Sequence, residues 1–208
     1  MQTSNIKEIR VLLSCPDEVV KEDDFLSHIE DIIQEVNILL VNNLNIRLEL
    51  RHWKKNMSLG RGEPRVQDRI NHRLVEHCDI FIGVLWTRFG TSPGTTLEGL
   101  CYESGTEEEF NLAQDLTKDI WIFFSDCPVR PSQINTEQLV KVNKFKKSLK
   151  SSQIQYSEFS TIKEFRRHFT VNISEWMKTR YSIADKEILE RKKDAPSKED
   201  FRKFTKGF

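Results

Sequence analysis

The sequence predicts an α/β fold, in which helices cover both faces of a parallel sheet of five strands. Short apolar runs alternate along the chain with segments whose apolar residues recur at helical spacing. The most apolar run, Asp79–Trp86, is apolar on both faces, as central parallel strands are. With 208 residues, 38% of them hydrophobic and 13 of them Phe, the chain has enough apolar material for one sizeable core.

The predicted strands are short apolar runs that stop at turn-forming or charged residues. The first ends at the turn Cys15-Pro16-Asp17, and the second alternates apolar and polar residues, which is typical of a half-buried or an edge strand. The five ranges are Ile9–Ser14, Ile46–Trp53, Asp79–Trp86, Ile120–Phe124 and Ile154–Phe159.

Helices are predicted between and after these strands. Apolar residues recur at helical spacing from Phe25 to Leu40, and a Gly-containing loop, Asn56–Pro64, precedes the next helix. The other predicted helices are Val66–His77, Gly105–Leu116, Thr136–Leu149 and Thr161–Tyr181. Residues from about 183 are charged, with a helix breaker at Pro196, so we divide the chain into a domain, 1–182, and a helical arm or linker, 183–208.

Right-handed crossovers between successive parallel strands predict the strand order 2-1-3-4-5, the flavodoxin-like arrangement. In that order, ligands bind outside the carboxyl ends of strands 1 and 3, where the order reverses. The loops at this edge are Ser14–Asp17, Arg88–Ser104 and Ser125–Pro131.

Composition narrows the classes of function. The chain has 32 Lys and Arg against 32 Asp and Glu, and this neutral balance argues against a nucleic-acid binder. No apolar run approaches the ~20 residues that cross a bilayer, and no signal-peptide pattern precedes residue 30, so we expect a cytoplasmic protein without membrane contact. The four Cys form no CxxC pair, and His72 and His77 miss the i, i+4 zinc spacing, so no metal site is expected.

The segment Ser104–Ala113 is the most informative part of the chain. Gly105 permits a tight turn, and Thr106 is a suitable N-cap for the helix that follows. Glu107, Glu108 and Glu109 then fall in the first helical turn, where the helix dipole favours negative charge. A purely structural alternative exists, because Ser104-x-x-Glu107 and Thr106-x-x-Glu109 both fit a capping box.

The pattern Gly105-Thr106-x-x-Glu109-x-x-x-Ala113 resembles the glutamate-bearing helix start of nucleoside deoxyribosyltransferases. The wider chain resembles a TIR-like family found ahead of NTPase signalling modules and in bacterial anti-phage proteins. The matching pieces are the first strand into Ser14-Cys15-Pro16, Gly60-x-Gly62-x-Pro64-x-x-Gln67, Cys78–Thr91, Ser104–Phe110 and Ile120–Asp126.

This resemblance implies a flavodoxin-like fold and a glycohydrolase that cleaves the nicotinamide–ribose bond of NAD. Glu109 matches the catalytic glutamate, and Glu108 takes that role if the helix starts one residue away. NAD is then a substrate, and no cofactor is implied. The resemblance also implies self-association, activation by assembly, a fused or separate sensor or NTPase module, and a role in defence or signalling.

Five residues are candidates for binding the substrate. Arg88 directly follows the central strand, and Arg61 and Arg65 flank the Gly-containing loop, where guanidinium groups suit phosphate or, alternatively, are solvated loop charges. Trp86 ends the third strand and either stacks on a base or packs in the core, and the same alternatives hold for Trp53. Ser14 ends the first strand and either bonds a ribose hydroxyl or forms the turn.

Three functions remain open from the sequence. The first is the NAD glycohydrolase, and the second is a non-catalytic interaction module with the same fold. The third is an N-glycosidase or deoxyribosyltransferase that uses the same carboxylate on a smaller nucleoside or nucleotide. No nucleophile–base pair supports a serine or cysteine hydrolase.

Overall fold

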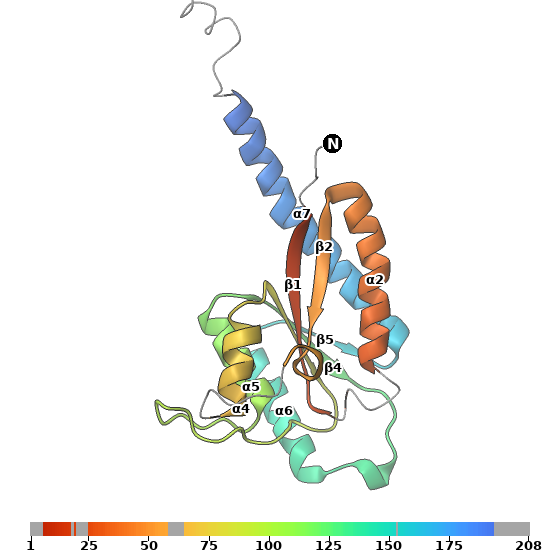
Figure 1. The fold of residues 1–208 in the computed structure, drawn as a ribbon. Helices are drawn as coiled ribbons and strands as arrows, with labels where there is room; N and C mark the ends of the chain where they lie inside the picture. Colours follow the sequence, from red (N-terminus) through yellow and green to blue (C-terminus); the bar gives the residue numbers. More distant parts are fainter. Residues whose placement is uncertain (1–5, 18, 20–24, 58–64, 153, 194–208) are drawn as a thin grey trace, which may run out of the picture. The chain divides into compact units, whose positions relative to one another are not determined.

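A computed structural model describes residues 6–17, 19, 25–57, 65–152 and 154–193 of the chain. It contains a sheet of five strands in the order β2-β1-β3-β4-β5, and every neighbouring pair is parallel (Figure 1). The predicted fold class and strand order are therefore confirmed. The strands are β1 (Lys7–Ser14), β2 (Ile46–Arg51), β3 (Ile80–Leu85), β4 (Asp119–Ser125) and β5 (Tyr156–Phe159).

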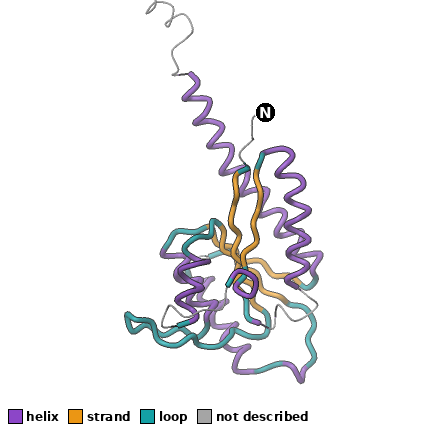
Figure 2. Tube along the Cα trace, viewed as in Figure 1, coloured by secondary structure: helices purple, strands orange, loops and turns teal. Residues whose placement is uncertain are grey.

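Helices connect the strands in the alternating order that the sequence predicts (Figure 2). They are α2 (Phe25–Leu44), α3 (Trp53–Asn56), α4 (Val66–Ile70), η1 (Asn71–Val75), α5 (Gly105–Asp115), η2 (Pro131–Gln133), α6 (Thr136–Ser151) and α7 (Ile162–Lys193). Three predictions are corrected. The second strand ends at Arg51, and Trp53, predicted to end it, is the first residue of the unpredicted helix α3. The helix predicted over Val66–His77 is a short α-helix followed by the π-helix η1, and the last helix continues past Tyr181 to Lys193.

The chain divides into two compact units, Met1–Arg166 and Arg167–Phe208. The first holds the sheet and all elements up to the start of α7, and the described part of the second is the rest of α7. The predicted boundary at residue 182 falls within α7 and stays a prediction. None of the described helices combines the length and apolar character that crossing a bilayer requires.

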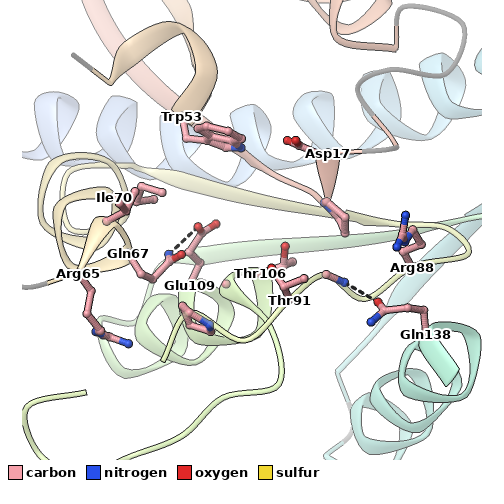
Figure 3. A pocket seen from close by; sticks show the side chains of 15 residues that line it. Asp17, Trp53, Arg65, Gln67, Ile70, Arg88, Thr91, Thr106, Glu109 and Gln138 are labelled. Atoms are coloured by element: carbon pink, nitrogen blue, oxygen red, sulfur yellow. Dashed lines mark hydrogen bonds between the residues drawn. The ribbon is translucent and has the colours of Figure 1, made fainter. Parts of the chain in front are cut away.

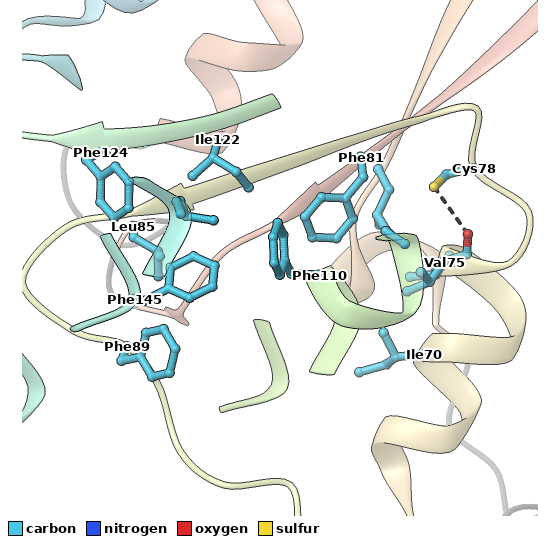
Figure 4. Packing of buried hydrophobic residues seen from close by; sticks show 14 of the residues in the cluster. Ile70, Val75, Cys78, Phe81, Leu85, Phe89, Phe110, Ile122, Phe124 and Phe145 are labelled. Carbon is cyan, nitrogen blue, oxygen red and sulfur yellow. Dashed lines mark hydrogen bonds between the residues drawn. The ribbon is translucent and has the colours of Figure 1, made fainter. Parts of the chain in front are cut away.

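One face of the sheet carries a core that α4, η1, α5 and α6 complete (Figure 4). Phe145 of α6 belongs to it, with its ring centroid 5.1 Å from that of Phe110 and 5.4 Å from that of Phe89. Phe81 and Leu85 of β3 are wholly buried in it. Because burying each such side chain contributes about 1.5–3 kcal/mol, this cluster fixes α5 against the central strands.

The opposite face carries a second aromatic group, and α2 protects one edge of the sheet. Phe165 lies 5.0–5.2 Å, centroid to centroid, from the rings of Phe25, Phe123 and Phe159. At the edge strand β2, the side chain of Asn37 in α2 donates to the carbonyl of Leu48 (2.9 Å) and accepts from its N–H (2.7 Å). The polar groups of Leu48 at the sheet edge are thus satisfied within the chain.

Candidate active site

Helix α5 begins at Gly105, and its N-cap is Ser104, not Thr106 as predicted. The Ser104 hydroxyl accepts a hydrogen bond from the Glu107 N–H (3.0 Å), and the Glu107 carboxylate accepts one from the Glu103 N–H (2.7 Å). Glu107 is therefore the glutamate that caps the helix. The capping box proposed for Thr106 and Glu109 does not form, because the Glu109 side chain bonds elsewhere.

Glu109 points from α5 toward the carboxyl end of β1, with only 7% of the residue exposed. The Ser14 hydroxyl, at the last residue of β1, donates to its Oε2 atom. The Gln67 amide, in the first turn of α4, donates to its Oε1 atom at 2.8 Å (Figure 3). Both carboxylate oxygens are therefore oriented by uncharged donors from two other elements.

The environment of Glu109 acts on its pKa in both directions. Burial raises the pKa above the usual value for Glu, and the negative charge of Glu108 raises it further. The hydrogen bonds from Ser14 and Gln67 oppose this, because they favour the ionised form. Burial is the largest effect, so the pKa of Glu109 is raised, which is common for carboxyl groups at catalytic sites.

Gly105 is required by the close approach of a neighbouring side chain and not by the tight turn predicted for it. It is the first residue of α5, and a Cβ atom there would lie 2.6 Å from the Gln67 Oε1 atom. A side chain at this position would displace Gln67. The glycine of the Gly-Thr pattern therefore leaves room for Gln67, which orients Glu109.

Glu108 has charged partners, in contrast to Glu109. The Arg65 guanidinium donates to both Glu108 oxygens, at 2.7 and 3.1 Å, and Asn71 donates to one of them at 2.8 Å. Arg65 also binds Asp68, and its pKa is raised by the hydrogen bonds that it donates to Glu108 and Asp68. The side chains of Glu108 and Arg65 are 5% and 13% exposed. This ion pair joins α5 to the start of α4.

A cavity of about 690 Å³ lies at the carboxyl ends of β1 and β3, where the strand order reverses, and Glu109 forms part of its wall (Figure 3). This volume is within the range of small-molecule sites, about 300–1,000 Å³. The lining residues are Pro16, Asp17, Trp53, Arg65, Val66, Gln67, Ile70, Arg88, Gly90, Thr91, Pro93, Gly105, Thr106, Glu109 and Gln138.

Gln138 of α6 holds the loop that carries Arg88. Its Oε1 atom accepts hydrogen bonds from the N–H groups of Phe89 (2.9 Å) and Gly90 (3.0 Å). Gly90 has a φ of +103°, a conformation that favours glycine. The loop therefore leaves β3 along a defined path beside the cavity.

The structure brings together most of the residues predicted for the site, but not all. Arg65, Arg88 and Glu109 line the cavity. Ser14 is not a lining residue, but its hydroxyl donates a hydrogen bond to Glu109. Glu108 lies beside them in its ion pair with Arg65. Arg61 lies outside the described residues.

Trp86 lies elsewhere, and Trp53 takes the place beside Glu109. The Trp86 indole donates to the Cys127 carbonyl at 3.0 Å and lines another cavity, with Phe25 and Phe159. Trp53 lines the cavity of Glu109 (Figure 3). Of the two tryptophans weighed for base stacking, the structure places Trp53 within reach of a ligand bound there.

Gln67, Asp17, Thr106 and Gln138 line the cavity but are not predicted from the sequence as catalytic or substrate-binding residues. The helical pattern could have identified Gln67. Gln67, Ile70 and Leu74 fall on one helical face, so Gln67 is a polar residue on a buried stripe. Such a residue needs a buried hydrogen-bond partner, and Glu109 is that partner.

A buried Cys–His pair lies next to these residues in sequence. The Cys15 Sγ and His52 Nε2 atoms are 3.9 Å apart, and both residues are buried. Burial lowers the pKa of His52 to about 4, and burial together with the charge of Glu109 raises the pKa of Cys15. Both are neutral near pH 7, so Cys15 is not a thiolate nucleophile.

Solved structures with detectable similarity to this chain include an elongation factor and an N-glycosidase. Translation elongation factor SelB from Methanococcus maripaludis matches in its apo form with a TM-score of 0.42 and 13% identity, over 82% of this chain and 34% of that one. Its complex with the GTP analogue GppNHp gives 0.42 and 14%, with the same coverage. The CMP N-glycosidase BcmB from Clostridium botulinum gives 0.39 and 15%, over 78% of this chain and 98% of that one. This chain thus spans about a third of the elongation factor's length.

The family comparison is more direct than these structural likenesses. No curated protein matches the chain in sequence. The family model described as "Domain of unknown function (DUF4062)" matches residues 26–174, which include β2 to β5 and the whole of α5. The chain belongs to the DUF4062 family.

Proposed function

We propose that this chain is an N-glycoside hydrolase that cleaves the bond between nicotinamide and ribose in NAD, with Glu109 as the catalytic carboxylate. The observation that carries the proposal is the placement of Glu109. It is a buried carboxylate on the wall of a cavity at the switch point of the sheet, and each of its oxygens is held by a neutral donor. Glu107 caps the helix and Glu108 is ion-paired, so Glu109 is the glutamate available for chemistry.

The proposed step breaks the bond between the ribose C1′ and the nicotinamide nitrogen. The bonding electron pair leaves with nicotinamide, and positive charge develops on the sugar, as in other glycoside cleavages. An ionised Glu109 stabilises that charge, and because Ser14 and Gln67 already orient it, little reorganisation is needed. A water oxygen then bonds to C1′ and releases one proton.

The titratable groups around the cavity favour NAD over a nucleoside monophosphate. Nicotinamide leaves as a neutral molecule, whereas cytosine or a purine must be protonated as it leaves. Among the described lining residues, the second carboxyl group is Asp17, which is half-exposed and pairs with Lys54 at 3.0 Å. A substrate that needs no general acid therefore fits this site better.

Two further lining residues suit a dinucleotide. Trp53 offers an aromatic face on which a nicotinamide or adenine ring can stack. Arg88 lies on the loop after β3, where its guanidinium can bind the pyrophosphate. In this proposal Arg65 forms the wall beside Glu108 and does not bind phosphate, because two carboxylates already hold its guanidinium.

The test is release of nicotinamide from NAD, measured on the whole chain over a range of protein concentrations, since the proposed enzyme is activated by self-association. Glu109→Gln is compared with Glu107→Gln, a matched change two residues away on the same helix. We expect Glu109→Gln to lower kcat by about 10²-fold or more and Glu107→Gln to stay near wild type.

Equal turnover by wild type and Glu109→Gln would contradict the assignment of Glu109. Release of the base from CMP, without release of nicotinamide from NAD, would replace the proposed substrate with a nucleoside monophosphate. No product from either substrate at any concentration would favour a non-catalytic interaction module.

A further inference from the structure

A basic pocket of about 340 Å³ lies apart from the cavity of Glu109 and shares no lining residue with it. The basic pocket is lined by Arg10, Arg51, Arg73, Leu74 and His77. Three of these five residues carry a guanidinium group and a fourth an imidazole. The function proposed above uses none of them.

Two adjacent strands and the π-helix η1 build this pocket. In the register of β1 and β2, Arg10 pairs with Glu49 and Leu12 with Arg51, so the two arginines are offset by two residue pairs and lie on the same face of the sheet. Leu12 and Leu74 belong to one core cluster, which identifies this face as the one that η1 covers. Helix η1 supplies Arg73 and Leu74, and π-helical turns are frequent at functional sites.

The arginines are oriented by other groups of the chain. Arg10 donates from Nη1 to the His77 carbonyl at 3.4 Å, and Arg51 donates from Nη2 to the Glu49 carboxylate at 2.8 Å. The Nε atom of Arg51 is buried and has no hydrogen-bond partner among the described residues. Because buried donors in folded proteins nearly all have a partner, this guanidinium is incompletely satisfied by the described part of the chain.

The nearby carboxylates all have partners within the chain, and one of them, Glu49, binds a lining residue. Glu49 binds Arg51, the Asp79 carboxylate accepts the backbone N–H of Arg10 at 2.8 Å, and Glu76 pairs with His72 at 3.0 Å. The lining itself contains no acid. The lining therefore holds three guanidinium groups and no carboxylate, so its side chains carry a net positive charge.

We infer that this basic pocket binds the pyrophosphate group of a small molecule. Guanidinium groups pair with phosphate oxygens through two parallel hydrogen bonds, and three of them exceed what one phosphate needs. The volume is also larger than a single phosphate fills and lies at the lower end of the range for small-molecule sites. This inference does not depend on the proposed NAD hydrolysis.

The experiment is calorimetric titration of the whole chain with inorganic pyrophosphate and, separately, with ADP. Arg73→Gln and Arg51→Met remove guanidinium groups from the basic pocket. Arg47→Gln is the matched control, because Arg47 is exposed on β2 outside the lining. We expect saturable binding of at least one ligand, weakened about tenfold in each pocket variant and unchanged in the control.

A second readout assigns the binding to this pocket even if one variant does not fold. The methyl NMR signals of Leu74 should shift on titration of wild type and of Arg88→Gln, whose change lies at the other cavity. The inference is overturned if neither ligand binds saturably, if Arg73→Gln and Arg51→Met bind as well as wild type, or if Arg88→Gln alone abolishes binding. If both ligands need the arginines and ADP binds more tightly than pyrophosphate, the nucleoside also contributes to binding.

Discussion

At the scale of single residues, the three adjacent glutamates of α5 have three different surroundings. Glu107 accepts a backbone hydrogen bond near the N-cap, Glu108 is paired with Arg65, and Glu109 is buried with neutral donors. Their separation follows from helix geometry, because successive residues are rotated by about 100°. Only the third faces the carboxyl end of β1, and this placement underlies its proposed role.

Replacing Glu109 with Gln should stabilise the protein at pH 7. The Gln oxygen can accept from Gln67 and its amide can donate to Ser14, so both hydrogen bonds survive and a buried charge is lost. The pKa of Glu109 is raised in the folded chain, whereas unfolded Glu titrates near about 4.3. Ionisation therefore destabilises wild type as the pH rises through this window.

Thermal unfolding of both proteins between pH 4 and 8 checks this. The melting temperature of Glu109→Gln should exceed that of wild type at pH 7, and the difference should shrink as the pH falls toward 4. A variant that is less stable at pH 7, or a difference independent of pH, would contradict the expected cost of the buried charge.

The sequence predicts Glu109 but not the residues that orient it. Glu109 is found from the Gly-Thr pattern on one helix, a local feature. Its partners Ser14 and Gln67 are 95 and 42 residues away, so their hydrogen bonds depend on how three elements pack. Gly105 shows the same limit, since its role depends on the approach of Gln67 and not on its own backbone angles.

At the scale of elements, an ion pair joins α4 and α5 beside the cavity. Arg65 binds Glu108, Asp68 and the Gly94 carbonyl, so it connects the start of α4, the first turn of α5 and the loop between β3 and α5. The pair is almost buried. It is a structural clamp for the elements that carry Gln67 and Glu109.

Removing Arg65 should lower the free energy of unfolding more than removing the charge of Glu108. Arg65→Met leaves Glu108 buried without its cation, which we expect to destabilise the fold by about 3 kcal/mol. Glu108→Gln leaves Arg65 bound to Asp68 and should cost less. Urea denaturation of both variants measures the free energies of unfolding. Equal and small effects, with Arg65→Met weakening only substrate binding, would restore Arg65 to the phosphate-binding role predicted from sequence.

The π-helix η1 is one of the elements that the sequence does not reveal. Val66, Ile70 and Leu74 recur at a spacing that fits a continuous α-helix, and residues 66–77 were expected to form one. A shift from α- to π-type hydrogen bonding leaves no mark on this pattern. It places Asn71 against Glu108 and Arg73 at the basic pocket, so its effect is on positions in space.

At the scale of the whole molecule, the strand order follows from the alternation of strands and helices, and the site follows from the strand order. Which tryptophan reaches the site does not follow. Trp86 comes after Leu85, whose side chain is in the core beside α5 and α6, so alternation along the strand turns Trp86 to the opposite face. A shift of one residue along the strand would turn Trp86 to the other face of the sheet. Strand ends predicted from sequence are not accurate to one residue.

The stability of the fold should also depend on pH through His52. Burial holds its pKa at about 4 in the folded protein, whereas unfolded His titrates near about 6.5. The stability that neutral His52 allows is therefore complete above pH 6.5 and is lost as the pH falls toward 4, by about 3 kcal/mol in total.

Because Glu109 titrates with the opposite sign, this effect is best measured in the Glu109→Gln background. Unfolding free energies of Glu109→Gln and of Glu109→Gln/His52→Gln are compared from pH 7 to pH 4. The first should lose stability steeply, and the second should show a flatter slope. Parallel slopes of unfolding free energy against pH would show that His52 does not titrate between its unfolded and folded pKa values.

The central claim is that Glu109 acts on the ribose of NAD, and a crystal structure of Glu109→Gln soaked with NAD tests it most directly. We expect NAD in the cavity between Trp53 and Arg88, with the side chain of residue 109 about 3–3.5 Å from the ribose at the nicotinamide end. NAD bound with its ribose out of reach of residue 109, or NAD bound outside this cavity, would contradict it.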